Sequence, residues 1–374
     1  MLVAILIFAA GLRAEEAAPA PAIAAKLQPF VDSHSLAGAV TLVATKDKIL
    51  SLEAVGFADI GEKKPMKTDS IFWIASQSKP ITAAALMMLV DEGKVNVDDP
   101  VEKYLPEFKD QQVLDGPDKD HKTLHAPKHP ILVRNVLSHT SGLPFASPME
   151  KPTLDLEPLS ERVKSYAKLA LNTEPDTKYA YSNAGINTAG RIIEVVSGMA
   201  YEEFLQKRLF DPLGMKDTTF WPNEEQIARI AKSYKPNKEK NNLEEIKIGQ
   251  LLYPLNDKKR QPMPAGGLFS TATDIARFCQ MVLNGGEMGG KRYLSEAAIK
   301  QMTSKQTGEL KDGYGFGWST GGGGFGHGGA ESTNMNIDPK SGLILIWMVQ
   351  HAGYAGDGGK SQGVFNEAAR ALAK

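Results

Sequence analysis

A serine and a lysine lie one helical turn apart in the segment Ser76-Gln77-Ser78-Lys79. Residues three apart share one face of a helix, so the lysine amine can reach the serine hydroxyl. A serine alcohol is a weak nucleophile at neutral pH and needs a neighbouring base. A lysine can be that base only when burial or nearby charge lowers its pKa. The pair therefore indicates an activated serine nucleophile.

The segments around this pair must position it. Residues 70–75 are a short apolar stretch typical of a strand, and residues 80–90 predict a buried helix that ends near Gly93. A second S-x-x-K motif, Ser165 to Lys168, lies in a charged helix predicted for residues 161–171, with no strand before it. About one such motif is expected by chance in a chain of this length. The context favours the Ser76 copy as the catalytic one.

Two later motifs contain groups that could complete the site: Tyr181-Ser182-Asn183 and His327-Gly328-Gly329. A phenol can shuttle protons once nearby cations lower its pKa, and an adjacent amide can hold both a substrate carbonyl and the lysine. A glycine-rich edge strand lets a substrate backbone approach closely. Each also has a plain structural explanation: Tyr181 as a half-buried aromatic, Asn183 as a helix cap and His327 as a strand-end histidine.

Together these motifs resemble those of the serine β-lactamase-like hydrolases. This group includes class C β-lactamases, family VIII carboxylesterases, D-alanyl-D-alanine carboxypeptidases and D-aminopeptidases. The order S-x-x-K, Y-x-N and H-x-G carries the likeness, and the segments 137–144, 264–271 and 314–318 are similar to further parts of the family pattern. The likeness runs from about residue 25 to the C-terminus.

The resemblance implies roles for these residues. Ser76 would be the acylated nucleophile, with Lys79 and Tyr181 together forming the general-base system. Asn183 would orient the substrate and Lys79. The backbone N–H groups of Ser76 and Ala330 would form the oxyanion hole, which typically stabilises the tetrahedral intermediate by a few kcal/mol per donor.

The third motif departs from the family pattern. Many β-lactamases carry lysine-threonine-glycine where this chain has His327-Gly328-Gly329. The resemblance assigns these three residues to substrate binding, with His327 supporting Tyr181 or facing a substrate carboxylate. A histidine is mostly neutral at pH 7, so the permanent cation for a β-lactam carboxylate is missing. We therefore expect an ester or a D-amino-acid peptide as substrate.

Composition narrows the classes of protein to which the chain can belong. With 374 residues and 42% hydrophobic content, it can bury the core of one large or two interleaved domains. A formal net charge of −1 argues against a nucleic-acid or acidic-polymer partner. The single cysteine, Cys279, lies on the apolar face of a predicted helix, so we expect it in the core, and no intramolecular disulfide is possible.

The N-terminus contains an apolar run at residues 2–10 and then an Ala/Pro/Glu-rich stretch. The run is too short to span a bilayer as a stable helix and is typical of a signal-peptide core, with cleavage expected after Ala14. No cluster of basic residues precedes it, which leaves the true start codon open. An N-terminal helix packed on the fold and a retained membrane anchor are the other interpretations. We predict a signal peptide and linker over residues 1–22 and a periplasmic or secreted protein.

The order of the elements predicts an α+β fold, and the resemblance makes it β-lactamase/transpeptidase-like. Strands at both ends, with helices between them, predict an antiparallel sheet from the N- and C-terminal segments, flanked by helices, with a mainly helical lobe inserted. The expected strands are residues 39–44, 49–57, 332–337 and 343–349, and the expected outer helices are residues 23–36 and 364–373.

The predicted catalytic domain covers residues 23–374 and has two lobes. The α/β lobe would comprise about 23–92 and 262–374, and the helical lobe about 93–261. Ser76 would lie in the cleft between them. Polar, proline-rich stretches at residues 106–130 and 235–264 are expected to be loops that shape this cleft.

Motifs for other chemistries are weaker. Gly321, Gly323 and Gly326 fit a dinucleotide-binding pattern, but no βαβ unit surrounds them and strands follow. Three histidines between residues 121 and 129 are spaced like metal ligands on a helix, but two prolines in the same stretch argue against that helix. We therefore predict no metal and no cofactor.

The sequence thus predicts an exported serine hydrolase that forms an acyl-enzyme on Ser76 and cleaves esters or D-amino-acid-containing peptides. A β-lactamase, or a penicillin- or peptidoglycan-binding sensor without turnover, are the other hypotheses. A sensor would stop after one stoichiometric acylation, whereas an enzyme would turn over. The expected partner is a small-molecule ester, peptide or β-lactam, and no obligate protein partner is evident.

Overall fold

The computed structural model describes residues 23–115 and 123–373. The predicted signal peptide and linker, residues 1–22, lie outside the described residues, as does His121. Within the described ranges, no helix is both long enough and apolar enough to cross a bilayer.

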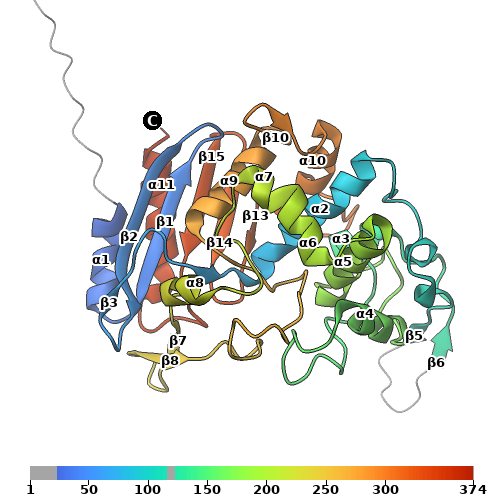
Figure 1. The fold of residues 1–374 in the computed structure, drawn as a ribbon, viewed down its shortest axis with the longest axis horizontal. Coiled ribbons are helices and arrows are strands. Elements are labelled where there is room, and N and C mark those ends of the chain that lie inside the picture. Colours follow the sequence, from blue (N-terminus) through green and yellow to red (C-terminus); the bar gives the residue numbers. More distant parts are fainter. Residues whose placement is uncertain (1–22, 116–122, 374) are drawn as a thin grey trace, which may run out of the picture.

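A seven-stranded antiparallel sheet joins the two ends of the chain (Figure 1). Its strand order is β12-β13-β14-β15-β1-β2-β3, so the first strand pairs with the last, β15. The sheet predicted from the N- and C-terminal segments is therefore confirmed. The strands are β1 (Gly38–Ala44), β2 (Ile49–Asp59), β3 (Lys64–Pro65), β12 (Ser319–Gly321), β13 (Gly324–Gly328), β14 (Asn334–Asp338) and β15 (Leu343–Met348).

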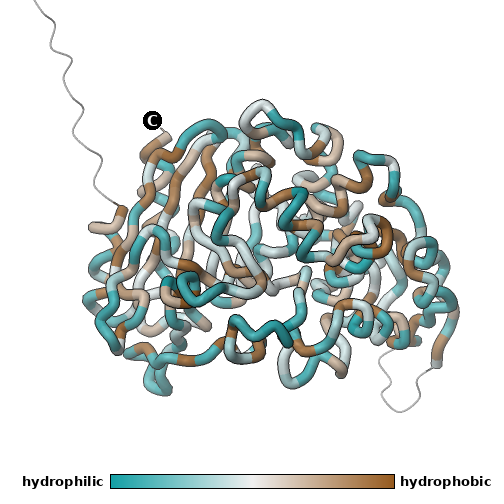
Figure 2. The backbone as a smooth tube through the Cα atoms, in the orientation of Figure 1, coloured by the Kyte–Doolittle hydropathy of each residue, from teal (hydrophilic) through white to brown (hydrophobic). Residues whose placement is uncertain are grey.

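Helices cover both faces of this sheet (Figure 1). Helices α1 (Ile23–Asp32) and α11 (Ser361–Ala371) pack on one face, where the rings of Trp347 and Phe365 stack with their centroids 5.6 Å apart. Helix α9 (Ala272–Leu283) packs against β1 and β15 on the other face. Because both faces are covered, every residue of β1 is buried. Figure 2 shows the hydrophobic residues along these central strands and helices.

A mainly helical region packs beside the sheet (Figure 1). Its centre is α5 (Asn183–Ser197), which contacts α2 (Ser78–Asp91), α3 (Val133–Ser138), α4 (Leu159–Ala167) and α6 (Tyr201–Leu205). The predicted α+β architecture with an inserted helical part is thus confirmed. The remaining α-helices are α7 (Asp211–Leu213), α8 (Glu224–Arg229) and α10 (Glu296–Thr303), and β10 (Glu287–Met288) pairs with β11 (Lys291–Arg292).

The two stretches predicted as loops contain regular structure. In the first, β5 (Val113–Asp115) pairs with β6 (Thr123–His125); in the second, β8 (Leu243–Ile246) pairs with β7 (Ser233–Pro236). The prediction of loops was wrong for these residues, because strands of three or four residues are too short to show hydrophobic alternation.

The structure places two residues that the sequence singled out, His125 and Cys279. His125 lies on β6, where its ring contacts Asp115 and Glu174 at 2.7 and 2.8 Å. The residues that the structure describes contain no group of three or more His, Cys, Asp or Glu arranged to hold a metal ion. Cys279 is fully buried in α9, as predicted, and burial raises the pKa of its thiol.

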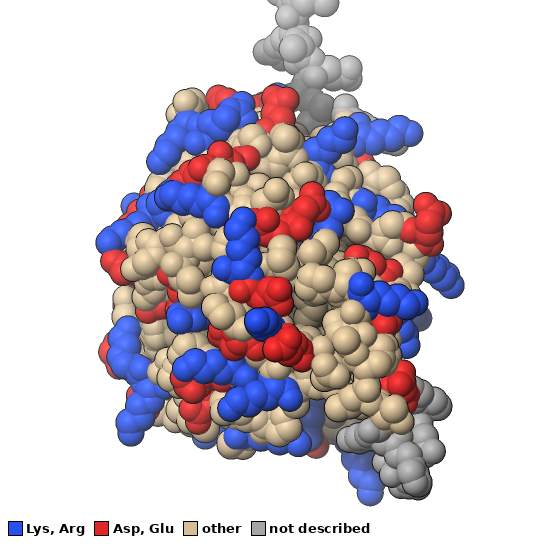
Figure 3. All heavy atoms as spheres, turned by 90° about the vertical axis from the view of Figure 1, so that its right-hand side faces the viewer, with Lys and Arg blue, Asp and Glu red and all other residues tan. Residues whose placement is uncertain are grey.

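Charges of both signs are mixed on the molecular surface. On the face shown in Figure 3, lysine and arginine side chains alternate with aspartate and glutamate side chains. Several ion pairs of the molecule join two exposed groups, such as Lys207 with Glu203 and Lys232 with Glu245. Exposed pairs of this kind contribute little to stability.

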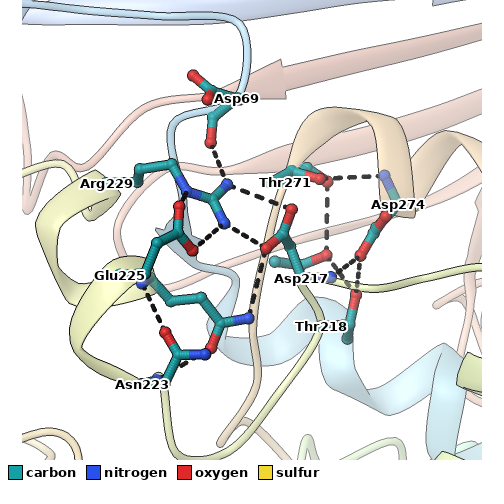
Figure 4. Close-up of polar contacts among 10 residues, drawn as sticks. Asp69, Asp217, Thr218, Asn223, Glu225, Arg229, Thr271 and Asp274 are labelled. Carbon is teal, nitrogen blue, oxygen red and sulfur yellow. Dashed lines mark hydrogen bonds and ion pairs between the residues drawn. The ribbon is translucent and has the colours of Figure 1, made fainter.

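A polar network anchors the segment before the nucleophile (Figure 4). The guanidinium of Arg229, on α8, donates to the carboxylates of Asp217 and Glu225 and to the carbonyl oxygen of Asp69. Asp69 precedes β4 (Phe72–Trp73), the strand that leads to Ser76. The network therefore holds the segment that precedes β4 against α8.

Asp274 lies at the buried end of the same network (Figure 4). Its carboxylate accepts the Asp217 N–H at 2.8 Å and the Thr218 hydroxyl at 2.9 Å. Burial raises the pKa of this carboxyl from 3.8 to about 6, and the nearby Asp217 charge acts in the same direction. Asp274 is therefore ionised at pH 7, although its buried surroundings favour the neutral carboxyl.

We expect Asp274→Asn to stabilise the protein at neutral pH, since the amide oxygen can still accept both hydrogen bonds. A carboxyl with a raised folded-state pKa favours folding most below its unfolded pKa of 3.8, and this contribution is lost as the pH rises through about 6. The gain in unfolding free energy should be about 1–3 kcal/mol at pH 7.5 and should shrink toward pH 4. Melting temperatures of both proteins across this range test it. A gain independent of pH would show that the charge is not the cause.

Candidate active site

Ser76 lies on a tight turn between a short strand and a buried helix. The strand is β4, which pairs with β9 (Phe269–Ser270), and helix α2 begins at Ser78. The predicted change from strand to helix is confirmed, although the helix begins two residues earlier than expected. Ala75 has a φ of +44°, a left-handed conformation that costs a non-glycine residue about 1–2 kcal/mol. Strain of this kind is concentrated at functional sites.

Hydrogen bonds to the neighbouring segment fix the turn. The Trp73 indole N–H donates to the Gly266 carbonyl at 2.7 Å, and the Ile74 N–H donates to the Leu268 carbonyl at 3.0 Å. Between residues 70 and 89, Ser76 is the only residue that is not buried. The turn therefore presents this one side chain to solvent and encloses its neighbours.

Lys79 is fully buried one helical turn beyond Ser76. Its amine lies 3.0 Å from Ser76 Oγ, 2.8 Å from Asn183 Oδ1 and 2.6 Å from the Ala265 carbonyl oxygen. It also lies 4.7 Å from the centroid of the Tyr181 ring. The structure thus brings together the first two predicted motifs.

Burial lowers the pKa of the Lys79 ammonium well below its ordinary value of 10.5. No carboxylate contributes to this shift, so desolvation of the charge acts without a compensating ion pair. A buried lysine of this kind can exist as a neutral amine near neutral pH. The site therefore contains a basic nitrogen within hydrogen-bonding distance of a serine hydroxyl.

Tyr181 differs from the sequence-based expectation in its ionisation. We expected nearby cations to lower its pKa, but burial raises the pKa of the phenol well above 10. Its hydrogen bond with Ser76 opposes this effect only in part. The expectation failed because the cation nearby, Lys79, is itself driven toward the neutral state. Tyr181 is therefore a protonated phenol beside the serine.

Asn183 is the first residue of α5 and is not its cap. Ser182 caps the helix, because its side chain accepts the Gly185 N–H at 3.1 Å. The side chain of Asn183 is therefore free to accept a hydrogen bond from Lys79. This geometry rules out the plain structural explanation for Asn183.

His327 lies on β13, and both of its ring nitrogens bond within the protein. Its Nδ1 donates to the Gly328 carbonyl at 2.8 Å, so Nε2 is unprotonated and accepts the Tyr314 hydroxyl at 2.9 Å. Burial, aided by the Lys79 charge, lowers the pKa of His327 to about 3. The ring centroids of His327 and Tyr181 are 6.1 Å apart. His327 is thus a neutral side chain behind Tyr181, with no free donor for a carboxylate.

The end of β13 packs directly against the nucleophile turn. A Cβ atom on Gly329 would lie 2.6 Å from the Ile74 carbonyl oxygen and 2.2 Å from Thr333 Oγ1. The exposed Ala330 follows, and among the described residues its N–H has no hydrogen-bond acceptor. A free N–H beside this turn is the feature that an oxyanion hole requires.

We expect Gly329→Ala to lower the free energy of unfolding by about 1–3 kcal/mol, because the added methyl would collide with the Ile74 backbone. Gly328→Ala is the matched control for stability, since its Cβ would have no neighbour closer than 3.5 Å. Thermal unfolding of both variants compares the two positions. Equal melting temperatures would contradict the close packing at Gly329.

The second S-x-x-K motif lies apart from this site. Ser165 is on α4, where its hydroxyl contacts Ser147 Oγ at 2.8 Å and donates to the Arg162 carbonyl at 2.6 Å. Lys168 follows the helix and is exposed. The structure therefore does not join Ser165 to a buried base.

Sequence reasoning gave no role to a buried chain of polar groups behind Lys79. The Ala265 N–H donates to Asn187 Oδ1 at 3.0 Å, the Asn187 amide donates to the Tyr166 hydroxyl at 2.9 Å, and that hydroxyl donates to Glu150 Oε1 at 2.6 Å. These residues come from four separate segments, so no local spacing links them. The only sequence signal for this chain of groups was the segment 264–271, which contains Ala265 and is similar to part of the family pattern.

A family model, curated relatives and a solved structure each match most of this chain. The family model described as Beta-lactamase matches residues 23–364. Penicillin-binding protein 4 of Amycolatopsis lactamdurans is 30% identical, over 83% of this chain and 80% of its own length. The lovastatin esterase of Penicillium rubens is 27% identical, over 75% of this chain and 72% of its own. The solved structure of EstCE1, a hydrolase with promiscuous acyltransferase activity, has a TM-score of 0.77 at 23% identity, over 93% of this chain and 97% of its own.

Proposed function

Because the chain belongs to the Beta-lactamase family, we propose that it is a serine hydrolase that forms an acyl-enzyme on Ser76. The observation that carries this proposal is the set of three contacts made by the buried Lys79 amine. A neutral amine has two N–H donors and one lone pair in a tetrahedral arrangement. With both donors directed to Asn183 and Ala265, the lone pair faces Ser76 Oγ at 3.0 Å.

The first chemical step follows from this geometry. Lys79 Nζ accepts the Ser76 proton while Oγ attacks the substrate carbonyl carbon. The carbonyl oxygen becomes an oxyanion and accepts the backbone N–H groups of Ser76 and Ala330. Gly329 brings Ala330 close to the nucleophile, since its backbone packs against Ile74.

The second step releases the leaving group. Tyr181, a protonated phenol beside Ser76, donates its proton to the leaving alkoxide or amine, and the Lys79 ammonium resupplies it. Water then attacks the acyl-enzyme, and the same groups return the proton to Ser76. Lys79 and Tyr181 therefore share the acid–base work, with Lys79 as the group that gains charge.

The third motif favours an ester or a D-amino-acid peptide over a β-lactam. His327 is neutral, and both ring nitrogens are engaged with Tyr314 and Gly328, so it offers no cation to a β-lactam carboxylate. Strand β12 pairs with β13 only at residues 324–326, so the end of β13 at His327 and Gly328 would admit an extended substrate backbone. The name of the lovastatin esterase is consistent with an ester substrate.

We also propose that the protein is exported and that residues 23–374 form the catalytic domain. The support for export is the apolar run at residues 2–10 with the Ala/Pro/Glu-rich stretch after it. Amino-terminal sequencing of the protein secreted by its host would test cleavage near Ala14.

The proposed activity is tested with p-nitrophenyl acetate and a chromogenic cephalosporin, using initial rates and intact mass. We expect multiple turnovers of the ester, a transient acyl adduct that maps to Ser76, and negligible cephalosporin turnover. One stoichiometric acylation without turnover would indicate a sensor instead. Rapid cephalosporin turnover would refute the argument from His327 and identify a β-lactamase.

A further inference from the structure

His139 holds the polypeptide on both sides of Tyr181. Its carbonyl oxygen accepts the Ala180 N–H at 2.8 Å, and its ring Nδ1 accepts the Ser182 N–H at 3.1 Å. Its ring also packs against the Tyr181 ring, with the centroids 4.4 Å apart. One residue therefore contacts the peptide before Tyr181, the peptide after it and the phenol ring itself.

Tyr181 depends on such contacts because it lies in irregular structure just before α5. No strand or helix fixes its backbone. The next two N–H groups, those of Asn183 and Ala184, both donate to the Phe145 carbonyl, at 3.0 and 3.1 Å. The segment from His139 to Phe145 is thus the support on which the Tyr181 segment rests.

His139 is well placed to be a rigid support. It follows α3 with a φ of +61° and has only 1% of its surface exposed. The adjoining Thr140 N–H donates to the Asn135 carbonyl at 3.1 Å, and the Asn135 amide donates to Asp176 Oδ1 at 2.6 Å. The turn that carries His139 is therefore fixed by bonds independent of Tyr181.

The ring of His139 has a defined protonation state. Because Nδ1 accepts a backbone N–H, its proton must lie on Nε2. Burial holds the pKa of His139 well below 6.5. Nδ1 therefore remains an acceptor at neutral pH, where the Ser182 contact does not titrate.

We propose that His139 is a positioning residue that holds the Tyr181 phenol in line with the leaving group. The inference rests on the proposed function, in which Tyr181 protonates that group. A misplaced phenol would slow departure of basic alcohols but would hardly affect p-nitrophenolate, which leaves without a proton. A merely structural residue would affect all esters alike.

The test compares kcat/KM for acetate esters of p-nitrophenol, phenol and ethanol, since kcat/KM reports the acylation half-reaction. His139→Phe keeps a ring but removes the acceptor. It should lower kcat/KM for ethyl acetate about 100-fold and for p-nitrophenyl acetate less than about tenfold. His139→Asn retains an acceptor near the Nδ1 position and tolerates the left-handed backbone. It should stay within about fivefold of the wild type for every ester.

Tyr181→Phe, alone and combined with His139→Phe, separates this inference from the proposed function. If His139 acts through Tyr181, the double variant should be no slower than Tyr181→Phe alone. A leaving-group effect in Tyr181→Phe that is missing from His139→Phe would overturn the His139 inference only. No such effect in Tyr181→Phe would overturn both proposals. His139→Phe could fail to fold, whereas asparagine tolerates the left-handed backbone at this position. The test then rests on His139→Asn, which keeps the acceptor. Loss of ethyl acetate activity in this variant would refute the role of the acceptor.

Discussion

Ser76→Ala should abolish hydrolysis of p-nitrophenyl acetate, with a fall in kcat of about 10⁴-fold or more. The substitution removes the oxygen that forms the acyl-enzyme, and no other residue in the site can replace it. Ser78, the next serine along the chain, is buried and already donates to the Ala75 carbonyl at 2.7 Å. The acyl adduct seen by intact mass should disappear together with turnover. The N–H groups of the proposed oxyanion hole belong to the backbone, so substrate binding should persist.

Ser165→Ala is the matched control for this variant. Ser165 belongs to the other S-x-x-K motif, but its hydroxyl bonds to Ser147 and to the Arg162 carbonyl on α4. The Ser165→Ala variant should therefore retain the wild-type kcat and form the same acyl adduct on Ser76. Ester hydrolysis that persists in Ser76→Ala, with an adduct on another residue, would refute the assignment of the nucleophile.

Much of the fold could be predicted because its hydrophobic pattern is strong. β1 and β15 are mostly apolar, buried strands, and their pairing joins the two ends of the chain in one sheet. Helix α2 was evident from its alanine-rich, buried sequence. The hairpins β5–β6 and β7–β8 were missed because strands of three or four residues are too short to show a periodic apolar face.

The site was predicted only in part because some of its contacts come from the backbone. Residue types and spacing point to Ser76, Lys79 and Asn183, and the structure brings these three together. The Ala265 carbonyl also accepts from Lys79, but any residue has a carbonyl group, so no side chain marks it. The ionisation of Tyr181 was predicted in the wrong direction, since only the packed structure shows how strongly burial raises the pKa of the phenol.

Lys79→Met should lower kcat/KM for p-nitrophenyl acetate by about 10³–10⁴-fold, because methionine fills the buried space but has no lone pair to accept the Ser76 proton. Arginine would not restore activity, since a guanidinium stays protonated and is larger. Lys168→Met, in the exposed part of the second motif, is the control and should leave the rate unchanged.

The pH dependence identifies the base more directly than the loss of rate. Only the neutral amine of Lys79 can accept a proton, so wild-type kcat/KM should fall as the pH decreases through the pKa of Lys79. Burial lowers that pKa well below 10.5, which brings the fall toward the neutral range. His327 has a pKa of about 3 and therefore cannot produce a fall above pH 5. The residual activity of Lys79→Met should lack this step, whereas Lys168→Met should retain it. If the same step persisted in Lys79→Met, another group would be the base, and the buried amine would serve only to orient Ser76.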